Sequence, residues 1–287
     1  MAVSELSATL TRVELTLADV PAGLALSDAA GWNQTADDWA VFIEHGHTVG
    51  LRTKDGQIVA TAAALPYEGD LGWIAMVLVA IEFRHRGLAT QLIDECVRAL
   101  QQGNVTPVLD ATPAGAQVYR RIGFVSGFEL ERWERGLADA EDLPPSSADL
   151  RRAGAEDLDT IVRLDAAANR IGRRFLLEAF LRRPDSRAWI ARDANGFVLA
   201  RRGRRATQIG PLVAEGPDRE MALLAVALAD IAGPVFLDVP TRWTQIASWL
   251  EQCGFKRQRG FVRMALGAAD VLSGDDRLFV LAGPEFG

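Results

Sequence analysis

The chain has 287 residues, 49% of them apolar and 24% charged, which is typical of globular protein and long enough for two domains. Its formal net charge of −7 is concentrated in residues 1–140, where 18 acidic side chains outnumber 10 basic ones, so we expect no nucleic-acid partner. No apolar run approaches the ~20 residues of a membrane span, and the first residues lack the pattern of a signal peptide, so we expect a cytoplasmic protein without a membrane partner.

In chain order, residues 1–135 are predicted to form a mixed set of strands and helices. The sequence Lys54-Asp55-Gly56 favours a hairpin turn, and the spacing of Leu88, Leu92 and Leu100 indicates an amphipathic helix. Strands are expected at 13–17, 48–52, 57–65, 72–80 and 105–110, helices at 21–33, 37–44, 86–100 and 113–122, and a closing strand pair over 124–133.

Residues 138–149 are rich in Asp, Glu, Pro and Ser, which is typical of a linker. We therefore expect a first domain over residues 1–140, a linker over 141–148 and a second domain over 149–287. In the second domain, strands are expected at 150–154, 188–192, 196–202, 207–214 and 235–238, helices at 156–165, 173–181, 219–231 and 241–252, and a closing strand pair over 255–266.

Neither the cysteines nor the arginine-rich stretches of the second domain point to chemistry. Cys96 and Cys253 lie in predicted helices of different halves, which favours small core residues over a disulfide and fits a reducing compartment. Arginines cluster at 173–174, 182–183 and 201–205, and we interpret these clusters as solvated helix and hairpin faces.

The two halves resemble each other in residues as well as in pattern. Segment 107–110 (PVLD) matches 234–238 (PVFLD) with one insertion. The residues Gly123-Phe124, Arg132 and Gly136 recur at identical spacing as Gly254-Phe255, Arg263 and Gly267. These correspondences indicate a duplicated structural unit.

The most informative segment is 76–90, in which an apolar strand is followed by a short turn and the pattern Arg-x-x-Gly-x-Ala at the start of a helix. A helix start presents unpaired backbone N–H groups and the positive end of its dipole. Gly87 lets a phosphate approach the backbone closely, and Arg84 and Arg86 add positive charge. The hexamer alone is a weak signal, but its position between strand and helix predicts a pyrophosphate site.

This segment resembles motif A of the GCN5-related N-acetyltransferases, and 116–124 (AQVYRRIGF) resembles their motif B. The resemblance is specific over the first half and only structural over the second. It implies an α/β (α+β) fold of two tandem domains, each with a mixed, mostly antiparallel central sheet flanked by helices. It also implies acetyl-CoA as cosubstrate and no metal.

In this family, the pantetheine arm pairs with a strand edge and backbone N–H groups hold the pyrophosphate, while a tyrosine protonates the leaving thiolate. Tyr119 stands at the matching position, and a phenol with a pKa near ~10 can donate to a thiolate whose acid has a pKa near ~8.5. The alternative is that its ring only packs. The residues expected to bind the coenzyme are Val77, Leu78, Val79, Arg84, His85, Arg86, Gly87, Leu88, Ala89 and Thr90.

The general base is left open. An alkyl amine is over 99% protonated at pH 7, given its pKa near ~10.4, and must lose a proton before it attacks. Asp110, at the end of a predicted strand, is one candidate for this base, and a chain of water molecules is another. Further candidates are Glu44, His45, His47, Glu68 and Asp70, for each of which a solvated surface role is the competing interpretation.

The second half lacks this equipment. Its matching helix is preceded by 215–220 (EGPDRE), whose carboxylates would repel a pyrophosphate, and Leu250 stands where the first half has Tyr119. We therefore expect an acetyltransferase that acts on a small-molecule or peptide amine, with one coenzyme site in the first half, as a monomer or homodimer. The alternative is a non-catalytic acyl-CoA-binding or sensing module.

Overall fold

A computed structural model describes residues 10–136, 149–215, 218–267 and 275–287. The linker predicted over 141–148 lies outside these residues, as do Gly216 and Pro217. The chain divides into two compact units, which we describe separately: Met1–Pro66 with Ile74–Asn104, and Tyr67–Trp73 with Val105–Gly287.

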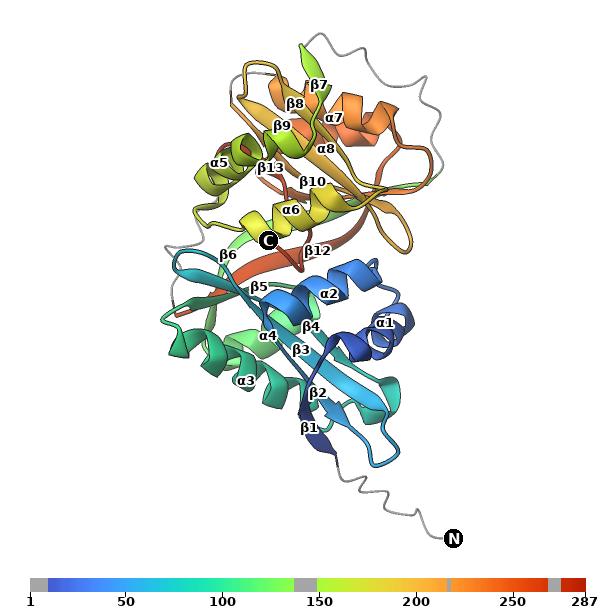
Figure 1. Ribbon diagram of the computed structural model, residues 1–287, viewed down its shortest axis with the longest axis vertical. Helices are drawn as coiled ribbons and strands as arrows, with labels where there is room; N and C mark the ends of the chain where they lie inside the picture. The colour runs from blue at the N-terminus through green and yellow to red at the C-terminus, as the bar shows by residue number, and fades with distance from the viewer. Residues whose placement is uncertain (1–9, 137–148, 216–217, 268–274) are drawn as a thin grey trace. The chain divides into compact units, whose positions relative to one another are not determined.

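The first unit is a sheet covered by helices on both faces (Figure 1). Its strands lie in the order β1 (Thr11–Glu14), β2 (His47–Arg52), β3 (Ile58–Pro66) and β4 (Leu71–Val79). Successive residues of β3 from Ile58 to Leu65 are all buried, which requires cover on both faces because side chains alternate along a strand. Helices α1 (Val20–Ala29), α2 (Ala36–His45) and α3 (Leu88–Gln102) contact β3 and provide this cover.

The second unit contains a longer sheet in the order β5-β12-β6-β11-β10-β9-β8-β7, in which β10 and β11 are parallel and the other neighbours are antiparallel. The first three residues of β4 also pair with β5 in parallel. The strands are β5 (Thr106–Ala111), β6 (Phe124–Arg135), β7 (Leu150–Arg152), β8 (Arg187–Ala191), β9 (Gly196–Arg202), β10 (Thr207–Ala214), β11 (Val235–Pro240) and β12 (Lys256–Leu266). This mixed, mostly antiparallel arrangement confirms the predicted fold class.

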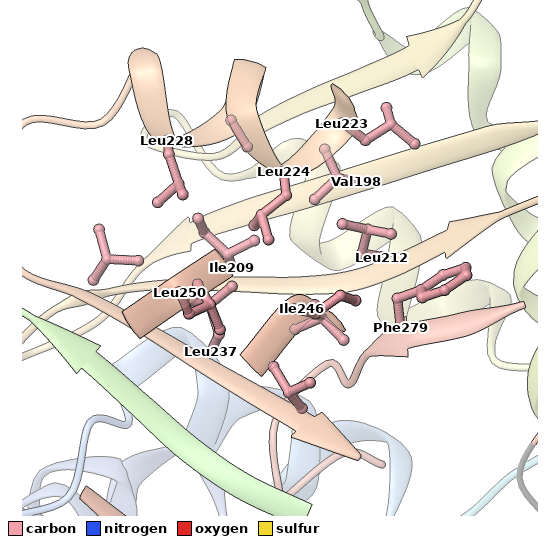
Figure 2. Close-up of a cluster of buried hydrophobic side chains, with 14 of the residues drawn as sticks. Val198, Ile209, Leu212, Leu223, Leu224, Leu228, Leu237, Ile246, Leu250 and Phe279 are labelled. Carbon is pink, nitrogen blue, oxygen red and sulfur yellow. The ribbon is translucent and has the colours of Figure 1, made fainter. Parts of the chain in front are cut away.

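Apolar side chains of two helices fill the core beside β9, β10 and β11 (Figure 2). Leu223, Leu224 and Leu228 come from α7 (Arg219–Ala229), and Ile246 and Leu250 come from α8 (Thr244–Gln252). The remaining helices of this unit are α4 (Pro113–Arg121), α5 (Leu158–Asn169) and α6 (Arg174–Arg182). Leu250, the position that matches Tyr119, is completely buried in this core.

The two closing strand pairs predicted from sequence are wrong. Each is a single long strand, β6 in the first half and β12 in the second. Each of these strands pairs with the other, because β12 inserts between β5 and β6 while β6 lies between β12 and β11. The compact units therefore do not coincide with the two halves of the repeat, and the predicted domain boundary stays a prediction.

A short strand that the sequence did not predict, β13 (Leu278–Val280), pairs with β10. The other predicted helices and strands are present with small shifts at their ends. Cys96 and Cys253 are both buried and unbonded to each other, and burial raises the pKa of the Cys96 thiol to about 12. Among the residues described, no helix has the length and apolar character needed to span a membrane.

Candidate functional site

Strand β4 carries an irregularity shortly before the start of α3. Its buried residue Met76 has a left-handed backbone (φ 53°), and the Thr61 hydroxyl donates to the Met76 carbonyl at 2.8 Å, which fixes this irregularity in the strand. Val77, Leu78 and Val79, the strand residues predicted to bind the coenzyme arm, follow directly after it.

The start of α3 presents a run of unpaired donors. None of the six consecutive backbone N–H groups from His85 to Thr90 donates a hydrogen bond within the part of the chain that is described. The first helical bond comes one residue later, from the Gln91 N–H to the Gly87 carbonyl at 3.1 Å. His85 (φ 63°) and Gly87 (φ 76°) are both left-handed. Alternation of this kind makes consecutive N–H groups converge on one anion.

Two arginines add charge beside these N–H groups. Arg84 Nε donates a hydrogen bond to the Val79 carbonyl at 3.1 Å, and Arg86 Nη2 donates one to the Glu82 carbonyl at 2.9 Å. Arg86 also lies over the Phe83 ring. A guanidinium carries five N–H donors, so each arginine keeps donors for a ligand while the backbone holds it in place. Both side chains are exposed.

The residues of this loop fit a pyrophosphate. A Cβ added at Gly87 would meet no atom within 4 Å, so the space in front of the helix start is open. Unpaired N–H groups, the helix dipole and two exposed guanidinium groups all favour an anion there. The loop residues predicted from sequence, His85 to Thr90 with Arg84, thus lie together in one unit with Val77 to Val79.

Tyr119 belongs to the second unit and lies on α4, which begins after Thr112. The Thr112 hydroxyl accepts a hydrogen bond from the Gly115 N–H at 3.2 Å and so caps the helix. The Tyr119 ring extends back along the helix, since a Cβ added at Gly115 would be 3.3 Å from its Cε2. The Tyr119 and Phe124 rings form a T-shaped pair with 5.8 Å between their centroids, and the Tyr119 side chain is half-buried.

Asp110 lies on β5 in a buried ion pair with Arg263 of β12. Arg263 Nε and Nη2 donate to the two carboxylate oxygens at 2.9 and 2.8 Å. Burial raises the pKa of Asp110, and the guanidinium of Arg263 opposes this rise. The Asp110 side chain has no exposed surface, so a base role would require access for the amine or for a water molecule. The role of Asp110 as general base stays a prediction.

The other candidate bases are spread over both units. Glu44 and His45 are exposed at the end of α2, whereas the His47 ring lies between Glu14 and Glu95 at 3.7 and 3.2 Å. Glu68 and Asp70 are exposed in the turn before β4. Among the described residues, no group of three or more His, Cys, Asp or Glu side chains is arranged to hold a metal ion.

The corresponding region of the second half has two distinctive features. Helix α7 begins after Asp218 and has Glu220 in its first turn, so two carboxyl groups lie at its start, whereas α3 begins after Gly87 and has no acidic residue in its first turn. Strands β10 and β11 pair only as far as Ile209. Beyond that point β13 pairs with β10, and the Leu281 N–H donates to the Asp238 carbonyl at 2.9 Å. The chain itself thus occupies the gap between these two strands.

Sequence analysis did not identify β13 or the ion-pair partners of Asp110 and Asp238. The Arg132 and Arg263 positions were visible as part of the repeat, but their partners were not, because pairing depends on which strands become neighbours. Arg132 donates to Asp238 at 2.9 and 2.8 Å, and this pair is also buried.

Comparison with known proteins gives consistent matches. Residues 44–126 and residues 161–280 each match a family model described as an acetyltransferase (GNAT) domain. The uncharacterized N-acetyltransferase YitH of Bacillus subtilis (strain 168) is 22% identical over 243 residues, which cover 82% of this chain and 83% of that protein.

Solved structures show the same fold. A candidate acetyltransferase from Pyrococcus horikoshii superposes with a TM-score of 0.82 at 19% identity, covering 100% of this chain and 99% of that one. A tandem GNAT protein from the clavulanic acid biosynthesis pathway superposes with a TM-score of 0.67 at 14% identity, covering 90% of this chain and 98% of that one.

Proposed function

The chain belongs to the GNAT acetyltransferase family and carries two such domains in tandem, and from this premise we propose that its first half transfers an acetyl group from acetyl-CoA to a primary amine. The observation that carries this proposal is the run of unpaired N–H groups from His85 to Thr90, in the same unit as Val77 to Val79 of β4. The N–H groups suit the pyrophosphate of the coenzyme, and strand β4 suits its amide-containing arm.

In the proposed reaction the amine nitrogen bonds to the acetyl carbon while the carbon–sulfur bond of the thioester breaks. The ammonium form of the acceptor first gives up a proton to a base. The candidates for this base are Asp110, a water chain, and the residues Glu44, His45, His47, Glu68 and Asp70. Tyr119 gives its phenolic proton to the departing thiolate. The second proton that the nitrogen loses as the amide forms passes to solvent, from which the tyrosinate recovers a proton. Removal of one proton-transfer group of this kind typically lowers the rate by ~10²–10⁴-fold.

The acceptor is proposed to be a small molecule or a peptide with a cationic amine. The excess of acidic side chains in residues 1–140 is the basis for this class, since an acidic surface raises the local concentration of cations. The charge excess does not select among polyamines, aminosugars and lysine side chains, so the assay must include all three.

The deciding experiment is a thiol-release assay with acetyl-CoA and a panel of amines drawn from these three classes. Amine-dependent release of free thiol, with acetylated amine detected by mass spectrometry, supports the proposal. The competing function, a non-catalytic acyl-CoA-binding module, predicts tight binding of acetyl-CoA by calorimetry and no thiol release above the spontaneous rate with any amine. That second result would reject turnover in the first half.

A further inference from the structure

Strands β6 and β12 are exchanged between the two halves of the repeat. The final strand of the second half, β12, pairs with β5 of the first half. The final strand of the first half, β6, pairs with β11, which is the equivalent of β5 in the second half. Read from either end, the order β5-β12-β6-β11 therefore gives the same succession of equivalent strands. The exchanged strands come from residues far apart in the sequence, yet they pair along almost their whole length. The first half therefore does not complete its own sheet.

The register between the exchanged strands is symmetric. Leu130 of β6 faces Phe261 of β12, and these are matching positions because residue 132 corresponds to residue 263. On either side of this central pair, Ser126 faces Met264 and Trp133 faces Arg257, which are again reciprocal positions. A local two-fold relation thus passes through the centre of the exchanged pair.

The buried ion pairs follow the same symmetry. Asp110 of the first half is paired with Arg263 of the second, and Asp238 of the second half is paired with Arg132 of the first. Both pairs have two hydrogen bonds, at 2.9 and 2.8 Å. In both, the two residues face each other across neighbouring strands. The Asp238 carboxylate also accepts a hydrogen bond from Gln208 at 2.9 Å.

The exchanged strand β12 supports the helix that carries Tyr119. Helix α4 contacts β12, and the Gly267 N–H that follows β12 donates to the Gly123 carbonyl, just beyond α4, at 3.2 Å. Asp110 lies two residues before Thr112, the N-cap of α4. The Asp110–Arg263 pair therefore fixes the end of β5 from which the helix departs.

We propose that the second half positions the catalytic acid of the first: Arg263 and strand β12 hold β5 and α4, and thereby set the place of the Tyr119 hydroxyl. This inference rests on the proposed function, in which Tyr119 is the acid. Arg263 does not touch the substrates in this proposal, so it is a positioning residue.

The duplicate pair makes a matched control available. Arg132 and Asp238 form the same buried contact. The helix that follows the strand of Asp238 is α8, which carries Leu250 in the core instead of a tyrosine. Loss of either pair should lower Tm. Only loss of the Asp110–Arg263 pair should affect catalysis, because only that pair lies before a helix with a chemical group.

The experiment compares Arg263→Met with Arg132→Met in the full chain. Arg263→Met is expected to lower kcat by ~10–100-fold, since a small displacement of a reacting group has effects of this size. The Kd for CoA should stay within about two-fold of wild type in both variants, because the CoA-binding loop lies in the other unit. Arg263→Lys should restore part of the rate, and the alkaline limb of the kcat–pH profile should move only in Arg263→Met.

A second pair of variants guards against unfolding. Removal of one partner leaves a buried charge, so Asp110→Asn with Arg263→Met and Asp238→Asn with Arg132→Met replace both charges at once. Equal kcat values for the two double variants would overturn the inference. Tyr119→Phe separates this result from failure of the proposed function. If kcat falls in Tyr119→Phe but stays at the wild-type value in Arg263→Met, only the positioning role of Arg263 is rejected. If kcat of Tyr119→Phe equals the wild-type value, Tyr119 is not the catalytic acid, and the inference is rejected as well.

Discussion

Gly87 connects backbone conformation to coenzyme binding at a single residue. It caps α3 with a left-handed backbone (φ 76°), and a Cβ there would meet no atom within 4 Å. We expect Gly87→Glu to weaken CoA binding at least ~100-fold, because it places a carboxylate before N–H groups that favour an anion. The protein should still fold, at a conformational cost of about 1–2 kcal/mol for a left-handed residue with a side chain. Calorimetry with CoA measures the first effect and thermal unfolding the second.

Gly254 provides the control for this variant. It has nearly the same backbone conformation (φ 79°), and a Cβ there would also meet no atom within 4 Å. Gly254→Glu should therefore lower Tm by a similar amount and leave CoA affinity unchanged. Equal loss of affinity in both variants, or none in either, would show that residues 85–90 do not hold the coenzyme.

Tyr119 allows a second test at the residue scale. Tyr119→Phe keeps the ring that packs against Phe124 and over Gly115 but removes the proton. We expect kcat to fall ~10²–10⁴-fold with little change in CoA affinity. The measurement is steady-state turnover beside calorimetric binding of CoA. A wild-type rate would mean that the ring only packs.

Residue roles could be predicted from sequence where they depend on local backbone geometry. The loop from Arg84 to Thr90 was identified because a strand, a turn and a helix start are adjacent in the chain, and their unpaired N–H groups follow from helix geometry. The pairing of Asp110 with Arg263 could not be predicted. The two residues are 153 positions apart, and their contact depends on the insertion of β12 beside β5.

At the scale of elements, the periodicity of apolar residues predicted the helices and most of the strands. The pairing predicted for the last strand of each half was wrong. Residues 124–133 and 255–266 were each predicted to form a strand pair, yet each region forms one strand, over Phe124–Arg135 and Lys256–Leu266. Neither segment contains Asn-Gly, Asp-Gly or Gly-Gly, although the first contains Ser126-Gly127, and the partner that each strand needs comes from the other half. The short strand β13 escaped prediction because three residues carry no recognisable period.

Helix α3 is tied to two strands of its sheet by an ion-pair cluster around Glu95. Arg12 of β1 donates to Glu95, and His47 of β2 lies 3.2 Å from the same carboxylate. The hydrogen bond from Arg12 is the main reason that the pKa of Glu95 is lowered. A carboxyl group with a lowered pKa in the folded state stabilises the protein above its unfolded pKa, and this contribution disappears as pH falls through the folded value.

The resulting prediction concerns stability in acid. Below the unfolded pKa of ~4.3 the free energy of unfolding should fall more steeply in wild type than in Glu95→Gln, with a difference of less than about 1 kcal/mol for a partly exposed pair. Chemical denaturation between pH ~3 and ~6 measures both slopes. Asp94→Asn, which changes an exposed carboxyl group on the same helix, is the control. Parallel curves for wild type and Glu95→Gln would contradict the predicted role of this pair.

At the scale of the whole molecule, the two halves share one framework, and only the first has the residues that we propose to bind the coenzyme and act in catalysis. The repeated Gly-Phe, Arg and Gly positions are parts of the exchanged strands and their ends, which explains why they persist in both halves. The helix starts differ in charge, because α7 begins after Asp218 with Glu220 in its first turn, whereas α3 begins after Gly87 and has no acidic residue there. The domain boundary proposed at 141–148 separates the repeats in sequence, while the exchange joins them in the fold.

This asymmetry predicts one molecule of CoA per chain. In the second half, β13 pairs with β10 beyond Ile209, so a coenzyme arm that paired with β10 there would have to displace this strand. Its residue Phe279 packs against Trp243, with 4.4 Å between the ring centroids. Acidic side chains at the start of α7 oppose a pyrophosphate, and Leu250 offers no proton. Isothermal titration calorimetry of the full chain with CoA should therefore give a stoichiometry near one for wild type and no detectable binding for Gly87→Glu. A stoichiometry of two, or a second binding event that survives in Gly87→Glu, would show that the second half binds coenzyme despite β13.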